Sequence, residues 1–315
     1  MAKQSSPIFL LGMQRSGTSL VRAFLANHPE IAIPIRGETQ FFAEWYKEVN
    51  SLNTMMEFQK FHQRFLVEST VSQWEIDWKS FSFQLKDEGV KSKQYFDALM
   101  SYYAMQQGKL RWGEKSTAHI ECIEQLLELY PEARYLVVVR DPRDTFCSAC
   151  SVKWNREELL CPRQYAQQWA SVYTRALGTL IRSRANWRVV RHESVVAKTK
   201  HVIEDIFSWL DEPFSEELLS PQHLDWEQNS SFGDQKWTDA NYKQYTSELK
   251  IDSSTVGRWK YILSPEETFN IEEGAYHGLL TFGYKLSSEL TPVQPKPRWK
   301  NGLRRIKATV LEALN

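Results

Sequence analysis

Short, continuously apolar runs alternate with amphipathic stretches along most of the chain. Residues 7–11 and 133–139 are such runs, a pattern typical of strands that are buried on both faces. Residues 187–191 predict a further strand. Apolar positions at helical spacing fill the intervals, over residues 18–27, 117–130, 165–184, 200–210 and 265–280. Buried strands separated by helices predict an α/β fold, with a parallel sheet flanked by helices on both faces.

Two long stretches depart from this alternation. Residues 39–110 have helical spacing and many aromatic side chains, with little strand signal, so we expect a helical insertion. Residues 221–254 are polar and rich in turn-forming residues, as in a lid or a disordered loop. We therefore expect a single domain over residues 1–290, followed by a basic tail over residues 291–315.

Composition sets limits on the partners of the chain. Of its 315 residues, 42% are hydrophobic and 25% are charged, and the formal net charge is zero, so no overall field favours nucleic acid. No apolar run approaches the ~20 residues that span a bilayer, so no integral membrane segment is expected. The four cysteines lack the spacing of a disulfide framework or a zinc site, which predicts free thiols, a cytoplasmic location and no bound metal. The sequence leaves the oligomeric state open.

A glycine-containing loop follows the first predicted strand and precedes a predicted helix. Its sequence is Gly12-Met13-Gln14-Arg15-Ser16-Gly17-Thr18-Ser19. Backbone N–H groups at such a helix start form a cradle for an anion, helped by the helix dipole. The spacing matches the phosphate loop of nucleotide hydrolases, but Thr18 occupies the position of the lysine and Arg15 supplies a cation instead. A tight turn without a ligand is the alternative, and the placement between strand and helix favours anion binding.

A second candidate anion site follows the strongest predicted strand. Arg140 stands at the carboxyl end of that strand, where open α/β folds bind ligands. Its guanidinium suits phosphate, and Ser148, eight residues later, adds a hydroxyl. With Asp141 and Asp144 nearby, an alternative interpretation is that Arg140 belongs to a surface ion-pair cluster. Asp141 also resembles the magnesium-binding residue of a phosphate-loop ATPase. The combination of Arg140 with the Arg15 loop favours anion binding.

These two motifs, in this order, resemble those of sulfotransferases that use 3′-phosphoadenosine 5′-phosphosulfate. The glycine-containing loop is similar to the 5′-phosphosulfate loop of that family, and Arg140 and Ser148 match the pair that holds the donor's 3′-phosphate. The resemblance implies a phosphate-loop fold like that of nucleotide kinases. It places seven residues at the donor: Arg15, Ser16, Gly17, Thr18, Ser19, Arg140 and Ser148.

Three shorter segments extend the resemblance to the tyrosylprotein, heparan and bacterial sulfotransferases. Residues 37–42 (Gly-Glu-Thr-Gln-Phe-Phe) are similar to the segment with the catalytic glutamate, here Glu38. Residues 113–116 (Gly-Glu-Lys-Ser) resemble the motif whose lysine reaches the reacting group, here Lys115. Residues 257–260 (Gly-Arg-Trp-Lys) are similar to a late loop that closes over the nucleotide.

The resemblance of this late loop implies that Arg258 and Trp259 contact the donor. Two other positions depart from the family pattern. Val152 stands where the tyrosylprotein enzymes have a nucleotide-binding arginine, and His192 stands where many relatives have a tyrosine.

Together these residues imply an in-line transfer of a sulfuryl group that needs no metal. Arg15 and the loop amides would hold the leaving 5′-phosphate, Lys115 would lie against the transferred group, and Glu38 would take the acceptor's proton. From residue types alone, Glu38 has an alternative role as a carboxylate that stabilises a helix N-terminus, and Lys115 as a solvated surface lysine. His28 and His119 are alternative bases, but their positions near helix ends indicate structural roles.

Two other classes of function remain open from the sequence. A phosphate-loop kinase or ATPase would use Ser19 and Asp141 around magnesium, but the loop lacks the lysine that this chemistry requires. A nucleotide-binding scaffold would keep the loop without turnover, and the presence of both Glu38 and Lys115 weighs against it.

The sequence indicates where the acceptor binds without naming it. Donor motifs lie at strand ends, so acceptor choice is expected to reside in residues 41–107, helped by residues 221–254. The first segment is rich in aromatic residues, including Phe42, Trp45 and Tyr46, which favours a small, partly hydrophobic acceptor with a hydroxyl or an amine. The alternative is that these aromatics pack only against one another as a helical core.

The tail over residues 291–315 combines basic charge with an apolar helical face. It holds six basic residues against one acidic residue. We expect it to be dispensable for the chemistry and to dock on the acidic body of the chain, in preference to binding a membrane surface.

Overall fold

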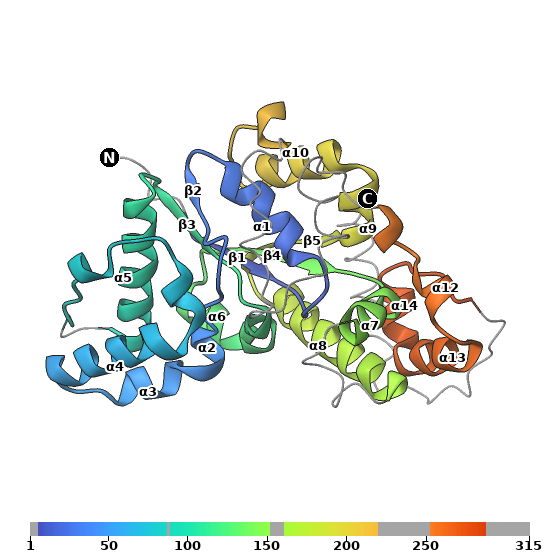
Figure 1. Ribbon diagram of the computed structural model, residues 1–315, viewed down its shortest axis with the longest axis horizontal. Helices are drawn as coiled ribbons and strands as arrows, with labels where there is room; N and C mark the ends of the chain where they lie inside the picture. Colours follow the sequence, from blue (N-terminus) through green and yellow to red (C-terminus); the bar gives the residue numbers. More distant parts are fainter. Residues whose placement is uncertain (1–5, 87–88, 152–160, 220–252, 288–315) are drawn as a thin grey trace.

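Five parallel strands form one sheet at the centre of the molecule (Figure 1). The computed structural model describes residues 6–86, 89–151, 161–219 and 253–287. The strand order is β2-β3-β1-β4-β5, and the strands are β1 (Ile8–Leu11), β2 (Ile31–Ala32), β3 (Arg111–Glu114), β4 (Arg134–Val139) and β5 (Asn186–Arg191). The predicted α/β fold with a parallel sheet is confirmed.

Alternating side chains of the strands pack into separate layers on the two faces of the sheet. Ile8 and Leu10 join one apolar cluster, which includes residues of α1 (Thr18–Asn27), α9 (His192–Ala197) and α10 (Thr199–Trp209). Phe9 and Leu11 join the other, which includes residues of α6 (Ile123–Leu129) and α8 (Pro162–Arg182). Helices therefore cover both faces, which explains why the strands are continuously apolar.

The aromatic-rich insertion is helical, as expected. It comprises α2 (Phe41–Glu44), α3 (Tyr46–Ser51), α4 (Met55–Glu68) and α5 (Lys91–Gln106), with 3₁₀ helices η1 (Thr70–Gln73) and η2 (Trp78–Ser80). Helix α5 packs on β2 and β3, and Figure 1 shows the four helices together at this end of the sheet.

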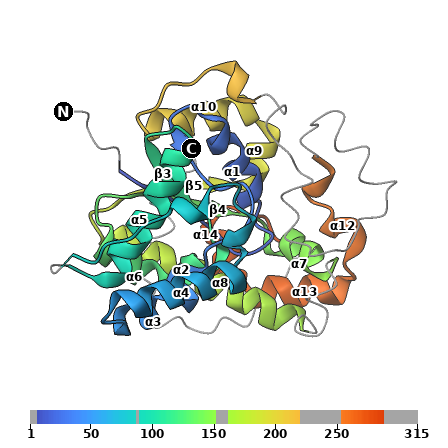
Figure 2. The ribbon, with the colours of Figure 1, turned by 60° about the vertical axis from the view of Figure 1, so that its left-hand side comes forward.

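A second group of helices lies beyond the other half of the sheet. It contains α7 (Pro142–Cys150), α12 (Trp259–Ile262), α13 (Pro265–Gly274) and α14 (Tyr276–Thr281). Helices α12 and α13 pack on α7, as Figure 2 also shows, and α13 packs along α8. Two further 3₁₀ helices are η5 (Glu216–Leu219) and η7 (Ser253–Thr255).

Three local differences from the sequence prediction have physical causes. The predicted helix over residues 117–130 begins as the 3₁₀ helix η3 (Thr117–Cys122), in which the His119 N–H donates to the Ser116 carbonyl at 3.1 Å. The predicted helix over residues 265–280 is divided at Ala275, beside Gly274, where a Cβ would lie 2.5 Å from the Arg163 carbonyl of α8. Strands β2 and β3 were not predicted because β2 is very short and β3 reads Arg-Trp-Gly-Glu.

Other expectations meet the structure only in part. The described part of the chain has no helix with the length and apolar character needed to cross a membrane. All four cysteines are free. Residues 220–252, which make up nearly all of the predicted lid, and the tail over residues 291–315 lie outside the described residues.

Candidate active site

The carboxyl ends of the parallel strands bring the sequence motifs to one edge of the sheet. The glycine-containing loop follows β1, Lys115 follows β3, Arg140 follows β4 and His192 follows β5. Strand β1 pairs with both β3 and β4, so the loop lies between the other two motifs. This is the edge at which open α/β sheets bind ligands.

A buried tyrosine fixes the glycine-containing loop. The N–H of Met13 donates to the hydroxyl of Tyr173 at 3.1 Å, and that hydroxyl donates to the Val138 carbonyl at 2.8 Å. Gly17 has a φ of 92° directly before α1 begins, a conformation that favours glycine. Gly12 is equally constrained, since a Cβ there would lie 2.7 Å from the Val138 carbonyl oxygen. The loop is therefore held in place before any ligand binds.

Arginines from three segments converge beside this loop. The Nε of Arg15 donates to the Ser148 hydroxyl at 2.9 Å, and Nη1 of Arg140 donates to the Arg15 carbonyl at 3.2 Å. Burial, followed by the charges of Arg140 and Arg258, lowers the pKa of Arg15 to about 10. Within the described structure, the Nε atoms of Arg140 and Arg258 are buried without a hydrogen-bond partner. Clustered cations with unsatisfied donors fit a ligand that carries several phosphate oxygens.

The late loop is anchored by the acidic residue that ends the Arg140 motif. Asp144 accepts from the N–H of Gly257 at 2.7 Å and from the N–H of Trp259 at 3.1 Å. The guanidinium of Arg143 lies 3.9 Å from the centre of the Trp259 ring. Trp259 is thus packed against α7, while the same loop carries Arg258 toward Arg15 and Arg140.

Asp141 is occupied by a protein partner. Its carboxylate accepts from Nε of Arg143 at 2.9 Å and from Nη2 of Arg143 at 2.6 Å, and its N–H donates to Glu193 at 2.8 Å. A magnesium ion at Asp141 would have to compete with this bidentate ion pair. The geometry therefore disfavours the kinase or ATPase interpretation.

Glu38 and Lys115 form an ion pair at the end of β3. The Lys115 ammonium donates to one carboxylate oxygen of Glu38, and the other oxygen accepts from the Thr117 N–H at 2.9 Å and the Thr117 hydroxyl at 3.1 Å. Lys115 is only 5% exposed, so the solvated-lysine interpretation is wrong. Burial opposes ionisation of Glu38, but Lys115, Thr117 and Arg22 more than offset it and lower the pKa of Glu38. Its carboxylate lies at the start of η3, so a helix N-terminal role accompanies any catalytic one.

Arg22 is a site residue that the sequence analysis missed. It lies on α1, one turn after Thr18, and is 3% exposed. Burial lowers the pKa of Arg22 to about 10, against the opposing charge of Glu38. The pKa of Lys115 is also lowered, by burial first and then by Arg22, against the opposing effect of Glu38. The helical spacing from Thr18 was the one signal that pointed to Arg22.

Both alternative bases have their ring nitrogens engaged. Nε2 of His28 contacts the Pro213 carbonyl at 3.1 Å, and Nδ1 accepts from the Glu30 N–H at 3.2 Å. Nε2 of His119 accepts from the Phe42 N–H at 3.1 Å, and Nδ1 contacts Glu114 at 2.8 Å. These bonds support structural roles for both histidines.

His192, which departs from the family pattern, lies beside the glycine-containing loop. It is 6% exposed, and neither ring nitrogen has a hydrogen-bond partner within the described structure. A Cβ on Gly17 would lie 2.2 Å from its Nδ1. Burial, together with Arg140 and Arg258, lowers the pKa of His192 to about 3.

The aromatic side chains proposed to line an acceptor pocket are mostly core. Phe42 is 4% exposed and Trp45 is 9% exposed. The Phe42 ring makes edge contacts with Phe41 and Phe96, and Trp45 makes them with Phe65. Packing among the aromatics is therefore the better description of these two residues, whereas Tyr46 is half-buried.

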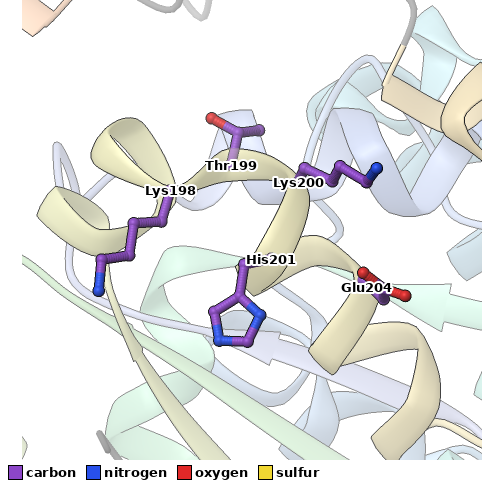
Figure 3. Close-up of a pocket in the computed structure, with 5 residues that line it drawn as sticks. All are labelled: Lys198, Thr199, Lys200, His201 and Glu204. Atoms are coloured by element: carbon purple, nitrogen blue, oxygen red, sulfur yellow. The ribbon is translucent and has the colours of Figure 1, made fainter.

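Hollows on the described part of the surface include the following two. One of about 400 Å³ lies between α7, β5 and the late loop, with Asp144, Glu193 and Trp259 among its lining residues. The other, also of about 400 Å³, lies where α9 meets α10, and Figure 3 shows its lining residues Lys198, Thr199, Lys200, His201 and Glu204. These side chains point in different directions instead of converging, so the second hollow lacks the arrangement of a ligand site.

Comparisons with known proteins agree with this geometry. The chain is 24% identical over 314 residues to the nodulation protein NoeE of Sinorhizobium fredii, an alignment that covers 91% of this chain and 69% of that protein. The fold is similar to the sulfotransferase domain from the curacin biosynthetic pathway, with a TM-score of 0.56, 20% identity and coverage of 90% of this chain and 100% of that domain. It is equally similar to the sulfotransferase domain of the Synechococcus PCC 7002 olefin synthase, with a TM-score of 0.56, 20% identity and coverage of 90% and 97%. The model of the sulfotransferase family matches residues 7–216. The chain therefore belongs to the sulfotransferase family of enzymes.

Proposed function

We propose that this sulfotransferase moves a sulfuryl group from 3′-phosphoadenosine 5′-phosphosulfate to a hydroxyl or amine of a small, partly hydrophobic acceptor. Adenosine 3′,5′-bisphosphate is the second product. The observation that carries the proposal is the convergence of Arg15, Arg140 and Arg258 beside a pre-formed anion loop, with two of the three arginines retaining an unsatisfied buried Nε.

The two anion-binding elements have separate tasks in this proposal. Arg15 and the N–H groups of residues 17–19 hold the 5′-phosphate that leaves, where the start of α1 adds its dipole. Arg140 and Ser148 hold the 3′-phosphate, and Arg258 adds charge from the late loop. The donor, when bound, supplies an activated sulfuryl group attached to a phosphate leaving group.

Glu38 and Lys115 serve the acceptor side. Glu38 is ionised at neutral pH because Lys115, Thr117 and Arg22 together outweigh its burial. An acceptor hydroxyl transfers its proton to the Glu38 carboxylate as the oxygen–sulfur bond forms. The Lys115 ammonium neutralises charge on the sulfuryl oxygens. When that ammonium is engaged by the anionic donor, it neutralises Glu38 less fully, and the carboxylate becomes a stronger base.

Thermal unfolding in EDTA tests the donor assignment. Adenosine 3′,5′-bisphosphate at about 100 times its dissociation constant should stabilise the fold by about 2.7 kcal/mol. ATP with magnesium should stabilise it less, because Asp141 is held by Arg143 and the loop lacks the phosphate-loop lysine. Larger stabilisation by ATP with magnesium than by the bisphosphate would contradict the proposal.

Transfer itself is tested without knowing the acceptor. The protein is incubated with ³⁵S-labelled donor and a metabolite extract, and the labelled product is identified by mass. A product that gains one sulfate identifies the acceptor. Tight binding of the bisphosphate without transfer to any extract would favour a nucleotide-binding scaffold.

A further inference from the structure

A buried polar network lies directly behind the proposed catalytic pair. Glu114, the last residue of β3, is 1% exposed. One of its carboxylate oxygens accepts from the Thr39 hydroxyl at 2.8 Å and from the Ser116 hydroxyl, and the other accepts from Nδ1 of His119 at 2.8 Å. Burial opposes the charge, but these three donors lower the pKa of Glu114, so it is a buried anion.

The same network binds the backbone that follows Glu38. The N–H of Gln40 donates to the Ser116 hydroxyl at 3.0 Å, and the N–H of Phe42 donates to Nε2 of His119 at 3.1 Å. The side chains of Glu114, Ser116 and His119 therefore hold residues 39–42 at three successive points.

Glu114 at the end of β3 and the three residues after it divide between two tasks. Glu114 and Ser116 bind the segment after Glu38, while Lys115 and Thr117 bind the carboxylate of Glu38. This division follows from the alternation of side chains along an extended chain. A single short segment thus fixes both the backbone and the carboxylate of the proposed base.

The hydrogen bonds determine the tautomer of His119. Because the Phe42 N–H donates to Nε2, the ring hydrogen is on Nδ1 and is donated to Glu114. The imidazole has no lone pair left for proton transfer, so it links the charge of Glu114 to the backbone of Phe42. A buried network of this kind often stabilises a fold no more than well-packed apolar side chains would. Its role is therefore better sought in the backbone segment that it positions.

We propose that Glu114 and His119 are positioning residues for sulfuryl transfer, which hold the segment that carries Glu38 so that its carboxylate faces Lys115. This inference rests on the proposed function and adds to it two residues that do not touch the reacting groups.

Two substitutions of nearly equal volume test the inference. Glu114→Gln removes the charge, and in either orientation of the amide one of its hydrogen-bond partners is left facing another donor or without an acceptor. Thr39→Val removes only the hydroxyl that donates to Glu114. The matched control is Glu212→Gln, because Glu212 pairs at 2.9 Å with Arg111, which begins the same strand β3 at its other end.

Each protein is measured in two ways. Affinity for adenosine 3′,5′-bisphosphate reports the donor site, and transfer of ³⁵S label into a fixed metabolite extract is followed from pH 4 to pH 9. The charged groups that face Glu38 are Lys115 and Arg22, so a displaced carboxylate loses stabilisation of its ionised form. We expect Glu114→Gln and Thr39→Val to bind the bisphosphate within about threefold of the wild type. We expect transfer to fall about 10–100-fold, with its acid limb moved to higher pH.

The control is expected to keep the wild-type transfer rate and acid limb. Wild-type transfer by the two variants, or a reduced rate with an unshifted acid limb, overturns the positioning role. If Glu114→Gln does not fold, Thr39→Val decides by the same criteria. A wild-type protein that transfers no label, or a Glu38→Gln variant that transfers at the full rate, instead overturns the proposed function and this inference with it.

Discussion

At the scale of single residues, the site combines a cluster of arginines with a buried ion pair. Burial lowers the pKa values of Arg15 and Arg140, and the nearby charge of Arg258 lowers both further, a repulsion that a bound anion relieves. Glu38 and Lys115 instead satisfy each other. A bound polyanion therefore gains most from the arginines, whereas the ion pair is available for proton transfer and charge neutralisation.

This difference predicts separable effects of two substitutions. Arg140→Ala should weaken binding of adenosine 3′,5′-bisphosphate by about 1.5–3 kcal/mol, because it removes charge-assisted hydrogen bonds. Glu38→Gln should keep that affinity and reduce transfer about 10²–10⁴-fold, because an amide does not accept the proton. Calorimetric titration gives the first quantity and ³⁵S transfer gives the second. Near-normal transfer by Glu38→Gln would place the base elsewhere in the site.

His192 predicts a pH dependence of stability. Its pKa is about 3 in the folded protein and near the ordinary 6.5 when unfolded. Between these pH values the unfolded chain binds a proton that the folded chain does not. The contribution of His192 to the free energy of unfolding is therefore complete above pH 6.5 and is lost as the pH falls toward 3. At about 1.4 kcal/mol per pKa unit, the loss between pH 7 and pH 5 is on the order of 2 kcal/mol.

Urea unfolding of His192→Phe at the two pH values measures this contribution. Between pH 7 and pH 5, the free energy of unfolding of the variant should fall by about 2 kcal/mol less than that of the wild type. His201→Gln, which removes an exposed imidazole from α10, is the control and should behave like the wild type. Equal losses in wild type and His192→Phe would show that another group carries the pH dependence.

At the scale of secondary-structure elements, strands with continuous apolar runs were predictable and polar ones were not. β1 and β4 are buried on both faces, and the sequence places them within one residue of their observed bounds. β3 carries Arg111 and Glu114, whose buried charges pair with Glu212, from a distant segment, and with His119, which the 3₁₀ turn after β3 brings back onto Glu114. Such partners are invisible to local periodicity, and the network around Glu114 was missed for the same reason.

The aromatic insertion gives a prediction about stability. Phe42→Ala should lower the free energy of unfolding by about 3–5 kcal/mol, because it opens a cavity among Phe41, Phe96 and Tyr130. Tyr46→Ala, at a half-buried position, should lower the free energy of unfolding by less, so that an effect on acceptor preference can be measured in a folded protein. Urea midpoints compare the two variants. If the Phe42→Ala protein is as stable as the wild type and has an altered acceptor preference, Phe42 lines the acceptor pocket and its assignment to the core is wrong.

At the scale of the whole molecule, parallel strands explain why motifs far apart in sequence were readable together. Lys115 and Arg140 follow their strands directly and Arg15 lies in the loop after β1, so the common edge at which parallel strands end gathers all three. Arg22 and Asp144 lie on helices and act through contacts that only the packing of α1 and α7 creates. The gathering of these motifs at one edge of the sheet was therefore predictable, whereas the contacts of Arg22 and Asp144 were not.

The basic tail over residues 291–315 is expected to be dispensable for sulfuryl transfer. Residues 291–315 hold six basic residues against one acidic residue, and the chain as a whole has zero net charge, so the rest of the chain carries the compensating negative charge. A positive tail beside an acidic body should interact with its own chain more readily than with an anionic membrane, and salt should screen this interaction. Deletion of residues 291–315 should leave both bisphosphate affinity and ³⁵S transfer within about twofold of the full chain, since the tail contributes none of the motif residues. Cosedimentation with phosphatidylserine vesicles at low and high salt distinguishes the alternatives. Strong, salt-sensitive binding of the full chain, absent from the deletion, would assign the tail to a membrane surface instead.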